Sequence, residues 1–141
     1  MWRLVMKVLP LVLLLLSTST FGGYLEESKV AVGTIMKSHH FSALNYNETH
    51  NGIYLNINRW SFGRYTNSIN QRSTVITYNN SLFKKKSFEI KSIVGMATGY
   101  EGTKYSYGDV LPMVGMSAQY WYFKGVLIPE AIVLGVEIPL N

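Results

Sequence analysis

The sequence contains no cysteine among its 141 residues. This absence excludes a disulfide framework, a thiolate metal site and the lipid-modified cysteine of a bacterial lipoprotein. The longest apolar run, VLPLVLLLL at residues 8–16, is too short to cross a bilayer as a helix. Charged residues make up only 15% of the chain, and no basic helix or arginine-rich stripe indicates nucleic-acid binding.

The apolar run at the amino end has the form of a secretory signal peptide. Arg3 and Lys7 precede it, and small residues follow it. We therefore expect residues 1–22 to be a signal peptide and residues 23–141 to form a single domain. Removal of this leader would lower the net charge from +5 to about +3, because Arg3 and Lys7 would be lost while all acidic residues lie downstream. The alternatives are an uncleaved anchor and a buried core helix.

Short runs with period-two alternation follow the leader, separated by clusters of Gly, Asn, Ser or Pro. This pattern is typical of an all-β meander. Since an exported small domain without disulfides must gain stability in another way, we expect a closed, eight-stranded, antiparallel up-and-down β-barrel. The expected strands are residues 30–37, 53–60, 62–67, 73–79, 87–98, 110–118, 120–128 and 131–140.

Charged residues recur in the middle of these strands. In the strand 131–140 every second residue is apolar, and Glu137 lies on the opposite face; Glu89, Lys91 and Lys124 have similar positions. A soluble lipocalin-like barrel would turn its apolar face inward, whereas a membrane barrel would turn that face to lipid and pair the charges inside. We expect the membrane barrel, because the chain carries an export signal and aromatic residues near strand ends. A soluble exported carrier is the alternative.

In a meander, successive connections lie alternately at the two ends of the barrel. If the amino terminus is periplasmic, the outward connections are residues 37–52, 67–73, 99–109 and 129–130. We expect the first of these, which holds all three histidines, to be the longest outward loop. This arrangement predicts the outer membrane of a Gram-negative bacterium, with the periplasm as the alternative. The expected partner is membrane lipid, either lipopolysaccharide or phospholipid, and not nucleic acid.

Four segments carry a resemblance to a known family: the Ser-x-His segment at 38–40, NYNETHNG at 45–52, RYTNS at 64–68 and VLPMVGMSAQYWYFKGVLIPEAIVLGVEI at 110–138. They resemble a group of small exported β-barrel proteins of bacteria and phages, which is similar to the lipid A palmitoyltransferases of the outer membrane. The resemblance implies acyl transfer on outer-leaflet lipid. It implies that His39 or His40 matches the family's first-loop histidine and that Ser68 matches its second-loop serine. Asn67 stands where the family has an aspartate.

Acyl transfer needs an activated hydroxyl, a base within hydrogen-bond reach and a group that orients the base. The candidate bases are His39, His40 and His50. The candidate hydroxyls are Ser38, Ser42, Ser68 and Ser73, and the candidate orienting groups are Glu48 and Asp109. The candidates for substrate binding are Asn47, Asn67 and Arg72. A second interpretation is that these residues only build and cap an ordered turn.

From these candidates we predict catalytic roles for His39, His40, Glu48 and Ser68, and we expect no metal or cofactor. Adjacent histidines point to opposite faces of an extended chain, and their spacing fits no familiar zinc site. The predicted function is the binding or modification of acyl chains of outer-leaflet lipid. The alternatives are a non-catalytic surface barrel, such as a phage-encoded exclusion protein, and the soluble carrier.

Overall fold

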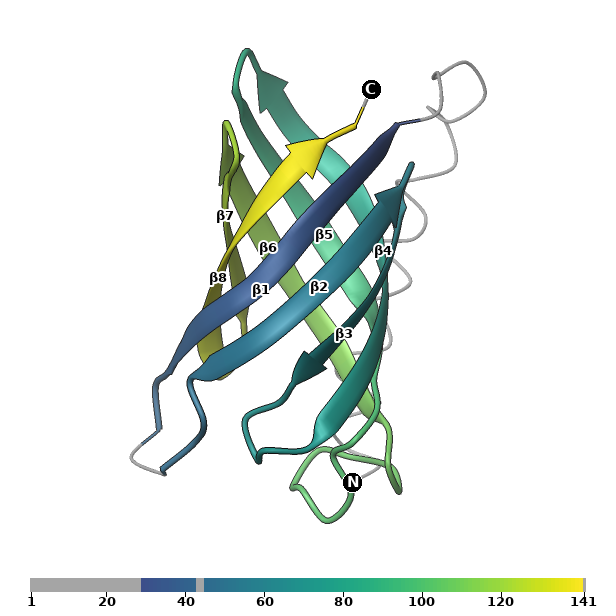
Figure 1. Ribbon diagram of the computed structural model, residues 1–141, viewed down its shortest axis with the longest axis vertical. Coiled ribbons are helices and arrows are strands. Elements are labelled where there is room, and N and C mark those ends of the chain that lie inside the picture. Colours follow the sequence, from purple (N-terminus) through teal and green to yellow (C-terminus); the bar gives the residue numbers. More distant parts are fainter. Residues whose placement is uncertain (1–28, 43–44, 141) are drawn as a thin grey trace.

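The structure is a computed structural model that describes residues 29–42 and 45–140. The predicted signal peptide, residues 1–22, lies outside the described residues. Eight strands form a closed antiparallel barrel in chain order, and β8 pairs with β1 (Figure 1), which confirms the predicted fold. The strands are β1 (Val30–His40), β2 (Thr49–Ile57), β3 (Trp60–Thr66), β4 (Arg72–Lys85), β5 (Phe88–Ala97), β6 (Leu111–Tyr120), β7 (Phe123–Ile128) and β8 (Ala131–Pro139). Across the two described ranges, no helix has the length and apolarity to span a membrane.

The first connection is shorter than the sequence predicts. Pairing with β8 extends β1 to His40, and β2 begins at Thr49, so all three histidines lie on strands. The expectation of a histidine-bearing longest loop is therefore wrong. The longest connection joins β5 to β6 and spans residues 98–110, whereas residues 41–48 join β1 to β2.

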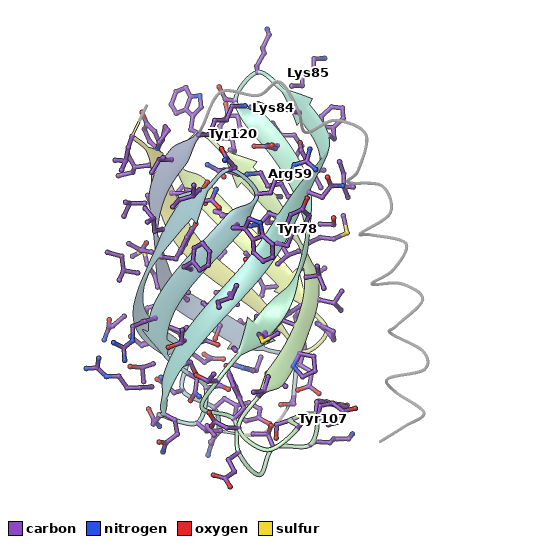
Figure 2. All side chains as sticks on the ribbon, turned by 90° about the vertical axis from the view of Figure 1, so that its right-hand side faces the viewer. Arg59, Tyr78, Lys84, Lys85, Tyr107 and Tyr120 are labelled. Atoms are coloured by element: carbon purple, nitrogen blue, oxygen red, sulfur yellow. The ribbon has the colours of Figure 1, made fainter. Side chains whose placement is uncertain are left out.

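The connections lie at two ends, which we call the loop end and the turn end. The loop end holds the connections β1–β2, β3–β4, β5–β6 and β7–β8, and lies at the bottom of Figure 1. The turn end holds the two-residue turns 58–59, 86–87 and 121–122. In Figure 2, Tyr107 marks the loop end, and Lys84 and Lys85 mark the turn end.

Apolar side chains cover the outside of the barrel, and polar side chains point inward. On β2, Leu55 is 38% exposed whereas its neighbour Asn56 is 7% exposed. On β8, Leu134 is 54% exposed whereas Glu137 is 4% exposed, and Lys124 on β7 is also buried. Because successive side chains of a strand point to opposite faces, this distribution follows the alternation in the sequence. It is the reverse of the distribution in a soluble barrel.

A buried ion pair joins the neighbouring strands β7 and β8 inside the barrel. Lys124 Nζ donates a hydrogen bond to Glu137 Oε2 at 2.8 Å, and the Tyr54 hydroxyl donates to the same oxygen at 2.6 Å. Gly33 leaves the space that Tyr54 occupies, since a Cβ at Gly33 would lie 2.0 Å from Cζ of the tyrosine ring. A buried charge is stable only when it is paired and hydrogen-bonded, and this cluster meets both conditions.

Further polar contacts fill the interior toward the turn end. Ser61 Oγ donates to Asn56 Oδ1 at 2.7 Å, and Asn79 Nδ2 donates to Ser61 Oγ at 2.8 Å. Lys91 Nζ lies 3.5 Å from Glu89 Oε2. The inward charges are thus paired, as expected from their positions in the strands, and the remaining space lies toward the loop end.

We expect Lys124→Met to destabilise the barrel by about 3–5 kcal/mol, because Glu137 would keep a buried charge without its partner. Urea unfolding of the protein in detergent micelles, followed by tryptophan fluorescence, measures the change. Lys85→Met is the matched control, since Lys85 is exposed, and we expect a change within about 0.5 kcal/mol. Equal unfolding midpoints for Lys124→Met and the unaltered chain would contradict the expectation.

Candidate functional site

A cavity of about 490 Å³ extends from the loop end to the level of Lys124. This volume lies in the range of about 300–1,000 Å³ that is typical of small-molecule sites. Inward side chains of β5 to β8 form an apolar wall, consisting of Ile93, Leu111, Met113, Val126, Ile128 and Val133. The polar side chains Ser38, His40 and His50 lie on the wall formed by β1 and β2, which adjoins β8. The cavity therefore has an apolar body beside a polar wall.

Ser38 and His50 lie together on the polar wall of this cavity. Ser38 Oγ is 2.6 Å from His50 Nε2, and His50 Nδ1 is 2.7 Å from the carbonyl oxygen of Thr66. Because a carbonyl oxygen can only accept hydrogen bonds, Nδ1 carries the ring proton and donates a hydrogen bond to the Thr66 carbonyl. In the neutral ring Nε2 then accepts a hydrogen bond from the Ser38 hydroxyl. The arrangement joins a hydroxyl, a base and a group that orients the base.

Strand geometry explains how this pair forms. The pairing of β1 shifts register between Ile35 and Lys37, and this bulge lets Ser38 point into the barrel. His50 follows the regular inward alternation of β2, together with Tyr54. Ser38 is 7% exposed and His50 is 4% exposed. The pair is therefore largely shielded from bulk solvent.

Two of the predicted catalytic residues lie on the outer surface. His39 Nδ1 is 3.5 Å from Glu48 Oε1, and the two side chains are 75% and 48% exposed. Glu48 Oε1 also accepts a hydrogen bond from the backbone N–H of His40 at 3.2 Å. The structure brings His39 and Glu48 to each other but not to the cavity or to Ser68.

The other two predicted catalytic residues, His40 and Ser68, line the cavity. The His40 ring lies 4.6 Å from the Tyr46 ring, and its Nδ1 is buried without a hydrogen-bond partner among the described residues. Ser68 lies beside Tyr100, whose hydroxyl is 2.7 Å from the hydroxyl of Tyr65. Burial raises the pKa of Tyr100 above its ordinary value. In the described part of the chain, Ser68 forms no hydrogen bond with a histidine.

Asn67 holds two loop-end connections together. Its Nδ2 donates to Ser73 Oγ at 2.9 Å and to the Gly99 carbonyl at 2.7 Å. Its Oδ1 accepts from the backbone N–H groups of Ile69 at 3.0 Å and Gln71 at 2.9 Å. Because the side chain is fully buried and both its atoms are bonded, Asn67 acts as an internal clamp. An aspartate could not donate to Gly99.

The remaining predicted residues surround this clamp. Asn47 Nδ2 donates to the carbonyl oxygens of Thr49 and Asn67, at 2.6 and 3.1 Å. Asp109 Oδ1 accepts from the backbone N–H of Gly99 at 2.9 Å, so Asp109 orders the β5–β6 connection. Arg72 is exposed at the start of β4. Substrate binding by Asn47, Asn67 and Arg72 stays a prediction.

The Ser38–His50 pair is hard to select from the sequence. The alternation that puts His50 on the face of Tyr54 is visible there, but the bulge that turns Ser38 inward is not. The described residues contain no group of three His, Asp or Glu side chains that could hold a metal ion.

The fold and the site define a small closed β-barrel with an apolar outer face and an internal cavity that holds a Ser–His pair. Comparison with known protein families, with curated proteins and with solved structures gave no match. The resemblance to lipid A palmitoyltransferases therefore stays a prediction. The function is inferred from the chemistry of the site.

We expect Asn67→Asp to destabilise the loop end by about 1–3 kcal/mol, because a carboxylate would face the Gly99 carbonyl without a proton to donate. Hydrogen–deuterium exchange of the β3–β4 and β5–β6 connections measures the change. Asn70→Asp is the matched control, since Asn70 is exposed in the same turn. Equal exchange protection in Asn67→Asp and Asn70→Asp would show that the clamp does not depend on the amide.

Proposed function

We propose that this chain is a small outer-membrane β-barrel that binds an acyl chain of an outer-leaflet lipid in its cavity. The observation that carries the proposal is the apolar wall of the cavity, within a barrel whose interior is otherwise polar. An apolar cavity that opens at a polar rim suits a ligand with a long apolar tail and a polar head. A lipid acyl chain with its headgroup has this form.

The outer face of the barrel supports a place in a membrane. Large apolar side chains such as Ile53, Met96 and Phe123 are exposed, at 61%, 53% and 69%. A closed barrel leaves no strand edge unpaired, which is the condition for a sheet to lie in lipid. A soluble carrier would instead place its charges outside, whereas Lys124 and Glu137 lie inside. The distribution of apolar side chains outside and charged side chains inside therefore favours the membrane barrel over the lipocalin-like alternative.

The turn end has the features of a membrane–water interface. Its exposed aromatic residues include Trp60, Tyr120 and Trp121, which are 48%, 59% and 62% exposed. Aromatic residues of this kind form belts at both interfaces of membrane barrels. Lys84 and Lys85 extend beyond this belt on the β4–β5 hairpin (Figure 2), where they could meet lipid phosphates. This arrangement supports a barrel that spans the membrane with its cavity mouth at the other interface.

Photo-cross-linking tests lipid binding in the cavity. The full chain is refolded into vesicles that contain a phospholipid with a diazirine at the end of one acyl chain. We expect cross-links to inward residues of the apolar wall such as Met113, because the chain end would reach that wall. Peptide mass spectrometry distinguishes these from cross-links to the outward Ile132, which is 39% exposed and does not line the cavity. Cross-links confined to outward residues would overturn the proposal, since they report only lipid around the barrel.

Two neighbouring variants on β7 provide a matched comparison. We expect Val126→Trp to lower the yield of cross-links to the apolar wall, because its indole would occupy part of the cavity. Leu127→Trp adds the same ring to the outer face, where Leu127 is 51% exposed, and should keep these cross-links. Heat-modifiable electrophoretic mobility shows that both variants fold. Separation of outer membrane from periplasm in expressing cells tests the location, and recovery in the periplasm would contradict it.

A further inference from the structure

We propose that Ser38 and His50 are a catalytic nucleophile and its general base, which cleave the ester bond of a lipid whose acyl chain occupies the cavity. This inference rests on the proposed function, because the apolar chain must first enter the barrel. Neither residue belongs to the set His39, His40 and Ser68 that the sequence and its family resemblance favour. The assignment comes from the geometry of the pair.

The hydrogen-bond chain prepares Ser38 for nucleophilic attack. The Thr66 carbonyl accepts from His50 Nδ1 at 2.7 Å, which leaves the Nε2 lone pair 2.6 Å from Ser38 Oγ. A serine hydroxyl is a weak nucleophile until an adjacent base takes its proton. In serine hydrolases a carboxylate commonly orients the base, and here a backbone carbonyl has that position. The carbonyl selects the same tautomer as a carboxylate would, with the proton on Nδ1, because a carbonyl oxygen can only accept a hydrogen bond.

The surroundings of the pair fit a site for an apolar ester. Ser38 and His50 line the same cavity as Met113 and Val133. Val133 on β8 is the register partner of Ser38 on β1, so an apolar side chain lies directly beside the serine. The Tyr65 ring meets the His50 ring edge to face, with ring centroids 6.0 Å apart, and limits the movement of the imidazole. Exclusion of water strengthens electrostatic interactions at such a site. An ester carbonyl near Ser38 would thus have its acyl chain beside apolar side chains.

The reaction proceeds in two balanced steps. In the first, Ser38 Oγ attacks the ester carbonyl carbon while His50 Nε2 takes the hydroxyl proton. The ester C–O bond then breaks, the lipid alcohol leaves with the proton from His50, and the acyl group stays on Ser38. In the second step water gives a proton to His50 and its oxygen to the acyl carbon. The bond to Ser38 breaks, Ser38 Oγ regains the proton, and the free fatty acid is released.

The sequence neighbours of the pair offer matched controls. Lys37 precedes Ser38 and Thr49 precedes His50, and both neighbours are exposed. The full chain is refolded into vesicles of phosphatidylglycerol and phosphatidylethanolamine, or into vesicles that contain lipopolysaccharide. Mass spectrometry of released fatty acid then identifies which class of ester is cleaved. A fluorophosphonate probe followed by peptide mapping reports the nucleophile directly.

We expect Ser38→Ala to abolish fatty-acid release and probe labelling of the β1 peptide. His50→Asn should lower the rate about 100-fold or more, because general-base catalysis contributes about 10²–10⁴ in rate. Lys37→Ala and Thr49→Ala should keep both activities. Heat-modifiable mobility and lipid cross-linking to Met113 show whether the Ser38 and His50 variants retain the fold and the binding.

Two results would overturn the inference and leave lipid binding intact. The first is undiminished fatty-acid release by Ser38→Ala. The second is cross-linking of the unaltered chain to Met113 without fatty-acid release from either kind of vesicle and without probe labelling at Ser38. A failure of the proposed function has a different signature, since cross-links to the inward wall would then be absent from the unaltered chain.

Discussion

Pairing between β1 and β8 is the constraint on which the rest of the structure depends. It closes the barrel, so no strand presents unpaired N–H and C=O groups along an apolar outer face. Regular pairing is interrupted between Gly33 and Lys37, and there the Thr34 hydroxyl accepts a hydrogen bond from the Val136 N–H at 3.2 Å. The same irregularity turns Ser38 toward the interior. Closure and the candidate site thus have a common structural origin.

The interior is divided between two kinds of chemistry. Toward the turn end, the Lys124–Glu137 pair and its hydroxyl and amide neighbours satisfy one another and occupy the space. Toward the loop end, apolar side chains of β5 to β8 and the histidine-bearing strands β1 and β2 surround a cavity. The polar half can form the floor of this cavity because its charges are already paired. A ligand with an apolar tail would therefore meet a closed, polar floor and an apolar wall.

The loop end is organised by hydrogen bonds that hold its connections together. Asn67 links two connections, and Asn47 donates to the carbonyl of Asn67, so the β1–β2 connection is attached as well. This network lies directly after Thr66, whose carbonyl orients His50. An asparagine at position 67 can donate to Gly99, which the aspartate expected from the family resemblance cannot do. Asn67 then supports the site by holding the loop-end connections in place, and it takes no part in the chemistry.

The sequence by itself determined the number of strands, their order and which side chains share a face. These properties depend on period-two alternation and on turn residues, which are local, so Leu134 and Glu137 were assigned to opposite faces correctly. Only the tertiary structure decided that the apolar face is outside, that β1 extends to His40 and that Ser38 lies beside His50. The physical reason is that strand ends, bulges and register depend on pairing with a distant strand. Strict alternation from Gly33 would place Ser38 on the outer face. The extra residue at the bulge reverses the face of the residues that follow it, and this reversal depends on the pairing of β1 with its neighbours.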